Sequence, residues 1–405
     1  MLTFVLKVQM EGQSVKKSPT KLVLPIIVFS QFAGGSLWFV GNAVVRDLQE
    51  LLGLGEHAIA DISSAVQLGF MAGTLVFSLL SLADRFSPAR LFLFSSLAGA
   101  FFNIILIWLG TDLFSVLLLR FLTGFFLAGI YPVGMKIAAD WYDQGLGKAL
   151  GYLVGALVLG KAFPHFVKDM TEGLPWQIVL ISTSVLAVAG GLSLVLLVGD
   201  GPYRKQGARF NWMAIPEIFS SKDFRAAALG YFGHMWELYT VWTFIPLLLQ
   251  TYIEFSGASL TIPFWTFMII GSGAVACVVG GYLSLNKGSA PVAFGMLLTS
   301  CICCLVSPLL FYLPVAAFLL IMFVWGFAVV GDSAQFSAIV AKTAIPLYKG
   351  TALTVVNGIG FTITVFSIQF FSLLLEDWPA QYLFMILAIG PVLGLLFFKR
   401  LLGRF

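Results

Sequence analysis

Continuous apolar runs dominate this sequence and restrict its possible folds more than any other feature. A helix needs about 20 mostly apolar residues to cross the hydrocarbon layer of a bilayer. Twelve such runs can be marked, at about 22–45, 58–82, 91–110, 112–135, 146–166, 176–198, 226–250, 259–283, 291–311, 314–338, 351–374 and 381–398. The strands of a membrane β-barrel would instead be about 10 residues long and alternate in polarity. The sequence therefore predicts an all-α membrane protein with twelve transmembrane helices.

The composition excludes several other classes of protein. Only 10% of the 405 residues are charged, whereas a soluble domain carries about 25%. The net charge of +4 and the lack of a long Lys/Arg run argue against nucleic acid as a partner. No nucleophile–base pattern, zinc-spaced set or phosphate-binding glycine loop appears, so we expect no enzyme, metal or cofactor. The cysteines of "CICC" (301–304) have no nearby His or acidic residue and are expected to be buried thiols.

The distribution of Lys and Arg predicts the orientation. With the N-terminus inside, 19 of the 23 basic residues fall on the inner side, three on the outer side, and Arg120 lies within a span. This is a strong positive-inside signal. We expect a multi-pass protein of the cytoplasmic (inner) membrane, monomeric, with both termini in the cytoplasm.

The chain divides into two similar halves. We expect a tail at 1–21, a bundle at 22–198, a cytoplasmic loop at 199–225, a second bundle at 226–398 and a tail at 399–405. "RFLTGFFLAG" (120–129) aligns with "MFVWGFAVVG" (322–331), which places Gly124 on Gly326. Repeated bundles of this kind usually hold their substrate site at the interface between them.

These features resemble the major facilitator superfamily of secondary transporters. The resemblance extends over about 22–398 and includes "RFLTG" in the fourth span. It implies two pseudo-symmetric six-helix bundles that expose a central site to each side of the membrane in turn. It also implies that the first, fourth, seventh and tenth spans line the central cavity.

The loop after the second span, "LSLADRFSPAR" (80–90), carries the most specific part of the resemblance. Asp84, Arg85 and Arg90 match the family signature, while Leu80 and Ser87 stand where glycines are usual. The resemblance implies a cytoplasmic gate that breaks as the bundles move. The alternative is a solvated turn that anchors the helix at the lipid headgroups.

Four ionisable residues lie deep within the spans. They are Arg120, His234, Glu237 and Asp332, and each falls on one of the four cavity-lining spans that the resemblance implies. A charge at the bilayer centre costs about 2.5–3.5 kcal/mol on insertion scales, so such residues normally face a protein interior or an aqueous cavity.

Each of these residues allows two interpretations. Glu237 and His234 lie one helical turn apart and are candidates for proton coupling, as is Asp332, which could also serve a gate or an ion pair. The alternative is a fixed polar network that holds the seventh span. Arg120 needs an anion, which could be Glu237, Asp332 or a substrate carboxylate or phosphate.

Aromatic residues are candidates for the walls of a substrate site. Trp38, Tyr131, Trp236 and Tyr239 lie on the same spans, with helix packing as the alternative. Lys161 and His165 lie near the predicted outer end of the fifth span, where snorkelling to the membrane surface would explain them.

The sequence thus predicts a secondary transporter of a small organic solute, plausibly anionic, that is coupled to protons. One alternative is an exporter of drugs or siderophores by proton exchange. The segment 151–164 has no Gly-Pro pair of the kind typical of drug antiporters in the fifth span. An alternative of another class is a transporter-like sensor or scaffold that moves nothing.

Overall fold

The computed structural model describes residues 21–142, 146–204 and 210–403, and within these ranges the chain forms helices and no β-strand. Ten helical segments of this part are long and apolar enough to cross a membrane. Of the other two expected spans, the first is shorter and the seventh is a helix of 35 residues that contains His234 and Glu237. All twelve expected spans fall on helices, and the all-α prediction is confirmed.

The first half consists of α2 (Val23–Gly35), α3 (Val40–Ala43), α4 (Val45–Leu52), α5 (Ala58–Leu79), α6 (Leu82–Arg85), α7 (Pro88–Leu109), α8 (Leu113–Leu127), α9 (Tyr131–Trp141), α10 (Leu146–Met170) and α11 (Gln177–Leu197). The second half begins with η1 (Trp212–Ala214), α12 (Ile215–Ile218), α13 (Lys222–Ser256), α14 (Ile262–Lys287), α15 (Ser289–Leu310) and α16 (Val315–Gly331). It continues with α17 (Ser333–Thr343), η2 (Pro346–Tyr348), α18 (Lys349–Leu374), α19 (Ala380–Ile386), α20 (Ile389–Phe398) and η3 (Lys399–Leu401).

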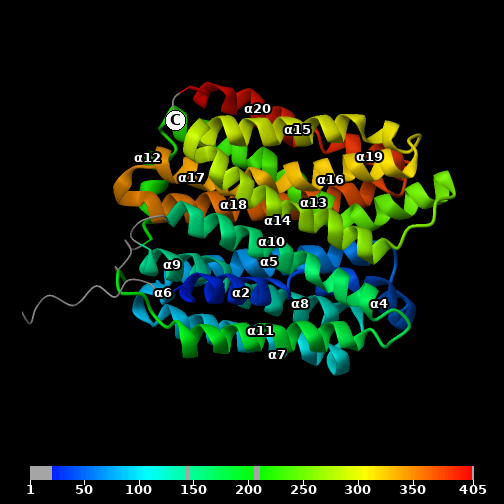
Figure 1. Cartoon of the computed structure of the whole chain (residues 1–405), viewed down its shortest axis with the longest axis horizontal. Helices are drawn as coiled ribbons and strands as arrows, with labels where there is room; N and C mark the ends of the chain where they lie inside the picture. The colour runs from blue at the N-terminus through cyan, green and yellow to red at the C-terminus, as the bar shows by residue number, and fades with distance from the viewer. Residues whose placement is uncertain (1–20, 143–145, 205–209, 404–405) are drawn as a thin grey trace, which may run out of the picture.

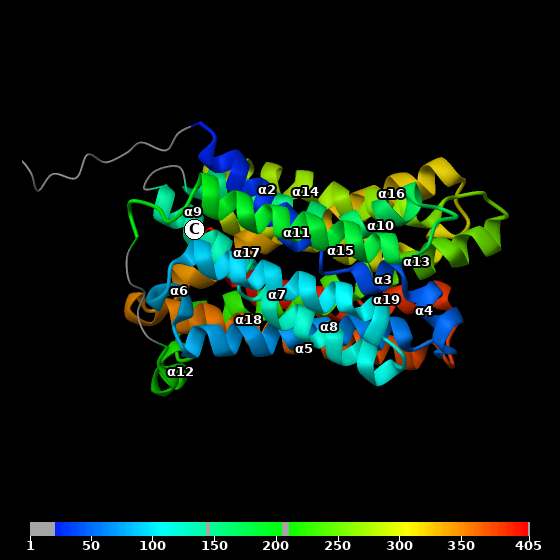
Figure 2. The same cartoon turned by 90° about the horizontal axis from the view of Figure 1, so that it is seen from below.

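Figure 1 shows the two halves side by side, with α2 to α11 in the lower part of the view and α13 to α20 in the upper part. The long helices run roughly parallel to the long axis of the molecule in both views (Figures 1 and 2). The halves meet chiefly where α10 packs on α14 and α5 packs on α18. The limits 22–198 and 226–398 remain our proposal for the two bundles.

The two ends of this helical bundle differ. We name the end that holds residues 21 and 403, together with α6, α9 and α12, the terminal end, and the opposite end, which holds α4, the distal end. Four of the expected spans are interrupted, and each is described as two helices: α2 with α3, α8 with α9, α16 with α17, and α19 with α20. These interruptions matter for function, because they place Trp38 and Asp332 outside regular helix.

Equivalent glycines pack the same way in each half. A Cβ at Gly124 would collide with the carbonyl oxygen of Val66, and a Cβ at Gly326 would collide with that of Ile269. The backbones of α8 and α5, and of α16 and α14, therefore touch, as small residues allow in membrane helices. The pairing of Gly124 with Gly326 that the sequence predicts thus has a structural counterpart.

Candidate functional site

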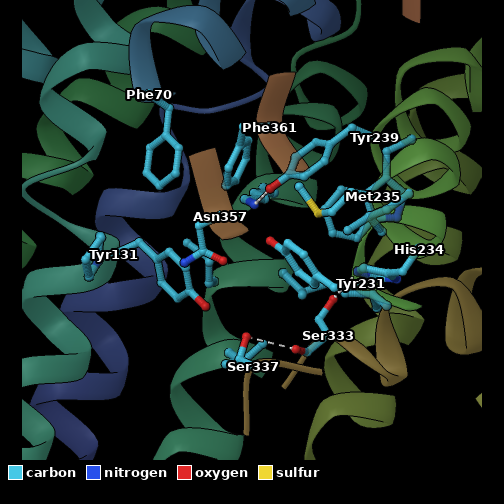
Figure 3. A pocket seen from close by; sticks show the side chains of 18 of the residues that line it. Phe70, Tyr131, Tyr231, His234, Met235, Tyr239, Ser333, Ser337, Asn357 and Phe361 are labelled. Atoms are coloured by element: carbon cyan, nitrogen blue, oxygen red, sulfur yellow. Dashed lines mark hydrogen bonds between the residues drawn. The ribbon is translucent and has the colours of Figure 1, made fainter. Parts of the chain in front are cut away.

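A small cavity lies between the two halves. Its volume is about 70 Å³, and it is lined by α5, α9 and α10 of the first half and by α13, α16, α17 and α18 of the second. In Figure 3, Phe70, Phe361 and Tyr239 gather at one side of the pocket, and Ser333 and Ser337 lie at the other. The cavity therefore combines an aromatic part with a hydroxyl-bearing part.

Lys161 is the cationic residue of this cavity, and the expectation that it snorkels to the membrane surface is wrong. Its side chain is only 4% exposed, and its ammonium donates a hydrogen bond of 2.5 Å to the hydroxyl of Tyr239. None of the ion pairs among the described residues includes Lys161. Burying a charge costs several kcal/mol even after relaxation, so a buried cation without a carboxylate needs an explanation.

Three aromatic rings surround the Lys161 ammonium. Its nitrogen lies 3.9 Å from the centroid of the Trp38 ring, 4.7 Å from that of Tyr239 and 5.5 Å from that of Trp242. Rings at these distances attract a cation through their negative faces. We call Lys161, Trp38, Tyr239 and Trp242 the cation cage.

The sequence allowed Lys161 to be found, but the predicted end of the fifth span was misplaced. The span was expected to end at 166, whereas α10 continues to Met170. Lys161 therefore lies nine residues from the helix end, which corresponds to about 14 Å at about 1.5 Å per residue. His165, one turn further along α10, is also buried, at 3% exposed, so snorkelling does not explain it either.

Arg120 lies outside the cavity, and its contacts do not support the substrate-binding role expected from the sequence. It donates hydrogen bonds to the Asn103 side chain at 2.9 Å and to the carbonyl oxygens of Leu37 and Trp38 at 2.8 and 2.7 Å. No ion pair among the described residues joins it to Glu237 or Asp332. Its guanidinium caps the interruption between α2 and α3, and so it holds the segment that carries Trp38.

A buried His–Asp pair reaches the cavity from the second half. His234 on α13 lines the cavity, and its Nδ1 lies 2.9 Å from Oδ1 of Asp332, at the junction of α16 and α17. The other ring nitrogen lies 2.8 Å from the hydroxyl of Ser333, which also lines the cavity. A histidine held in this way can exist with one or two ring protons. The proton-coupling role of His234 and Asp332 stays a prediction.

Glu237 points away from the cavity. Its Oε1 accepts hydrogen bonds from the hydroxyl of Ser300, from the thiol of Cys304 at 3.1 Å and from the indole of Trp325 at 2.9 Å. These donors come from α15 and α16. The contacts favour the alternative of a fixed polar network that holds the seventh span, and Glu237 is not among the residues that line the cavity.

The other aromatic candidates divide between the cavity and the interior. Tyr131 and Tyr239 line the cavity, and Trp38 stacks on Tyr239 at a centroid distance of 5.7 Å. Trp236 does not line it; its ring lies 6.0 Å from that of Phe370 on α18. Asn357 and Tyr231, which the sequence did not single out, also line the cavity.

A larger hollow of about 480 Å³ lies between the halves at the terminal end. It is lined by residues of α5, α6 and α9 on one side and of η2 and α18 on the other. Thr74 and Pro132 line both this hollow and the cavity, so the two spaces adjoin.

The predicted gate residues lie at the terminal end. Asp84 pairs with Lys136 of α9 at 3.0 Å, and both line the hollow. Arg204 donates hydrogen bonds to the carbonyl oxygens of Asp84 and Phe86 at 3.1 and 2.6 Å, which ties this turn to the loop that follows α11. The side chains of Arg85 and Arg90 are exposed. The gate role of these residues stays a prediction.

Polar contacts join the two halves at the distal end. His57 lies 2.6 Å from the carboxylate of Glu376 and 2.8 Å from the hydroxyl of Ser372. Gln369 donates hydrogen bonds to Asp61 and Ser64 at 3.2 and 2.9 Å. The described structure is therefore closed by side-chain contacts at the distal end and hollow at the terminal end.

The residues that the structure describes contain no cluster of three or more His, Cys, Asp or Glu that could hold a metal ion. The four cysteines are buried and free.

Comparison with known proteins identifies the class of this chain. The model of the Major Facilitator Superfamily matches residues 26–368. The chain belongs to this superfamily. It is therefore a multi-pass membrane protein that acts as a secondary transporter and not as an enzyme.

Solved structures share the fold. A crystal structure of a variant of the nucleoside transporter NupG matches with a TM-score of 0.71 and 15% sequence identity, and the match covers 94% of this chain and 99% of that one. No curated protein sequence matches this chain. The structural likeness at this identity establishes the fold alone.

Proposed function

We propose that this transporter moves a small organic solute by alternating access, through the cavity that contains Lys161 and His234, and that transport is coupled to protons. The observation that carries the proposal is the His234–Asp332 pair, a buried proton-binding group beside a cavity between the two halves. The cavity of about 70 Å³ is smaller than the roughly 150 Å³ that holds benzene in an engineered protein core. A small solute is therefore favoured over a bulky drug or siderophore.

The two ends of the bundle support alternating access. The distal contacts of His57 and Gln369 join the halves, while the hollow at the terminal end adjoins the cavity. The excess of Lys and Arg at the terminal end argues that this end faces the cytoplasm, in the inner membrane. The described structure then corresponds to a state open toward the cytoplasm, of a transporter that acts as a monomer.

Among the three candidates for proton coupling, we favour the His234–Asp332 pair over Glu237. The three donors on Glu237 Oε1 come from helices of its own half, so their geometry need not change as the halves move. His234 instead lines the cavity between the halves, whose surroundings we expect to change as the halves move. A group whose surroundings alternate between two states can bind a proton in one and release it in the other.

Transport in proteoliposomes with an imposed pH gradient tests this proposal. The first step is a screen of radiolabelled organic acids, sugars, amino acids and nucleosides with the wild-type protein. Asp332→Asn should abolish gradient-driven accumulation, to below about a tenth of the wild-type level, and retain exchange between labelled and unlabelled solute. Asp47→Asn is the control, because Asp47 pairs with Lys168 away from the cavity.

Full gradient-driven accumulation by Asp332→Asn would overturn the coupling role of the pair. Failure of the folded wild-type protein to move any solute of the screen would favour the sensor or scaffold alternative.

A further inference from the structure

Among the described residues of the first half, Arg120 and Lys161 are buried cations, and of these two Lys161 lines a cavity. We infer that the cation cage of Lys161, Trp38, Tyr239 and Trp242 binds the carboxylate of an organic monoanion with an apolar body. This inference rests on the proposed function and specifies the chemical class of the solute.

The first argument is the unmet charge of Lys161. Its ammonium has one hydrogen-bond partner, the neutral hydroxyl of Tyr239, and no carboxylate among the described residues within ion-pair distance. The rings of the cage attract the cation but do not neutralise it. Asp332, which lies next to the cavity-lining Ser333, is already paired with His234. A solute with one negative charge would supply the missing counter-ion.

The second argument is independent of Lys161. The indole N–H groups of Trp38 and Trp242 are buried and have no acceptor among the described residues. Tryptophan N–H groups usually find an acceptor when they are buried. Trp242 lines the cavity, and the ring of Trp38 lies against the Lys161 ammonium, so two donors without an acceptor belong to the cation cage. The oxygens of a carboxylate are strong acceptors.

The third argument concerns the body of the solute. Phe70 and Phe361, whose ring centroids lie 4.6 Å apart, line the cavity beside Tyr239. Their apolar surface would pack against a short aliphatic group. A single ammonium acts as a point charge, whereas phosphate is usually met by several donors or by the fork of an arginine. The site thus suits a monocarboxylate better than a phosphate ester.

The position of Tyr239 links this site to the movement of the halves. Lys161 belongs to α10 of the first half and Tyr239 to α13 of the second, so their hydrogen bond crosses the interface. A bound carboxylate can accept hydrogen bonds from both groups at once. Binding would then replace one direct contact between the halves by two contacts through the solute.

Equilibrium binding to the purified full-length protein tests the inference, with intrinsic tryptophan fluorescence and calorimetry as readouts. The probes are propionate and butyrate, each with its neutral isostere, propionamide and butyramide. We expect the better carboxylate to bind at least tenfold more tightly than its amide. Lys161→Met should remove this preference, and Lys161→Arg should keep part of it. Lys168→Met is the matched control, since Lys168 lies on the same helix and pairs with Asp47.

Equal affinity for acid and amide in the wild type, no binding of either acid, or an unchanged preference in Lys161→Met would each overturn the inference. Size-exclusion profiles establish that the variants fold. If Lys161→Met fails to fold, Tyr239→Phe provides a second test and should weaken carboxylate binding severalfold. Proton coupling is measured separately through Asp332→Asn. If Asp332→Asn keeps full gradient-driven accumulation while the wild type shows the carboxylate preference, the proposed coupling is contradicted and this site stands. If Asp332→Asn loses accumulation while the wild type binds acid and amide equally, this site is contradicted and the proposed coupling stands.

Discussion

Arg120 and Lys161 are both buried cations within membrane helices, but their surroundings differ. Arg120 is held by an asparagine side chain and two backbone carbonyl oxygens, all from its own half of the molecule. Lys161 has one neutral partner, and that partner belongs to the other half. A buried charge therefore does not by itself indicate a site. The indication comes from a charge whose partners are incomplete and that faces a cavity.

The largest expected effect is a difference in the free energy of unfolding between variants of Arg120 and of Lys161. Arg120→Met would leave the Asn103 side chain and two carbonyl groups without a donor, and an unsatisfied buried group costs about 1–3 kcal/mol. We expect a loss of about 3 kcal/mol or more in the free energy of unfolding. Lys161→Met should leave stability unchanged or raise it, because it removes an unpaired buried charge.

Thermal unfolding of both variants in the same detergent provides the measurement. A stable Arg120→Met protein, or a Lys161→Met protein that is equally damaged, would remove the distinction between the two residues.

A similar comparison applies to the two buried carboxylates of the second half. Glu237→Gln keeps the shape of the side chain but weakens charge-assisted hydrogen bonds from Ser300, Cys304 and Trp325. We expect a loss of about 1–2 kcal/mol in stability, with proton-driven accumulation retained in the folded fraction. Uptake normalised to the amount of folded protein is the measurement. If Glu237→Gln has normal stability but no proton-driven accumulation, Glu237 is the coupling residue.

The smallest effect is expected at the distal end. His57 and Glu376 form a pair whose side chains are 42% and 60% exposed, and exposed pairs contribute about 0–1 kcal/mol. Glu376→Gln should therefore shift the balance between the closed and open distal end by less than about fivefold. Labelling of a cysteine introduced near Gln250 with an impermeant reagent reports this shift. A change of a hundredfold would show that this contact, rather than the cavity, controls closure.

Much of the fold could be predicted from the sequence, because the spans depend on hydropathy and the halves on a repeat that includes Gly124 and Gly326. The interruptions of the spans could not be predicted, since they depend on partners distant in the sequence, such as Arg120 at the carbonyl oxygens of Leu37 and Trp38.

The candidate site was predictable only in part. His234, Asp332, Tyr131 and Tyr239 were identified by type and by span. The directions in which the side chains of Arg120 and Glu237 point could not be predicted, because hydropathy gives the depth of a side chain but not its neighbours. Lys161 was placed too close to the surface because an error of four residues in a helix end moves a residue by about 6 Å.

The glycines at the interface have a consequence for how the halves can move. A Cβ on Gly155 of α10 would lie 2.8 Å from the carbonyl oxygen of Ala274, and a Cβ on Gly281 of α14 would lie 3.9 Å from the Cα of Gly151. At these glycines the backbones of the two helices come close, while side chains such as Tyr152 and Tyr282 meet elsewhere along the same contact. When the two halves move, we expect α10 and α14 to pivot at these close approaches, while the backbone contacts at Gly124 and Gly326 hold the helices of each half together.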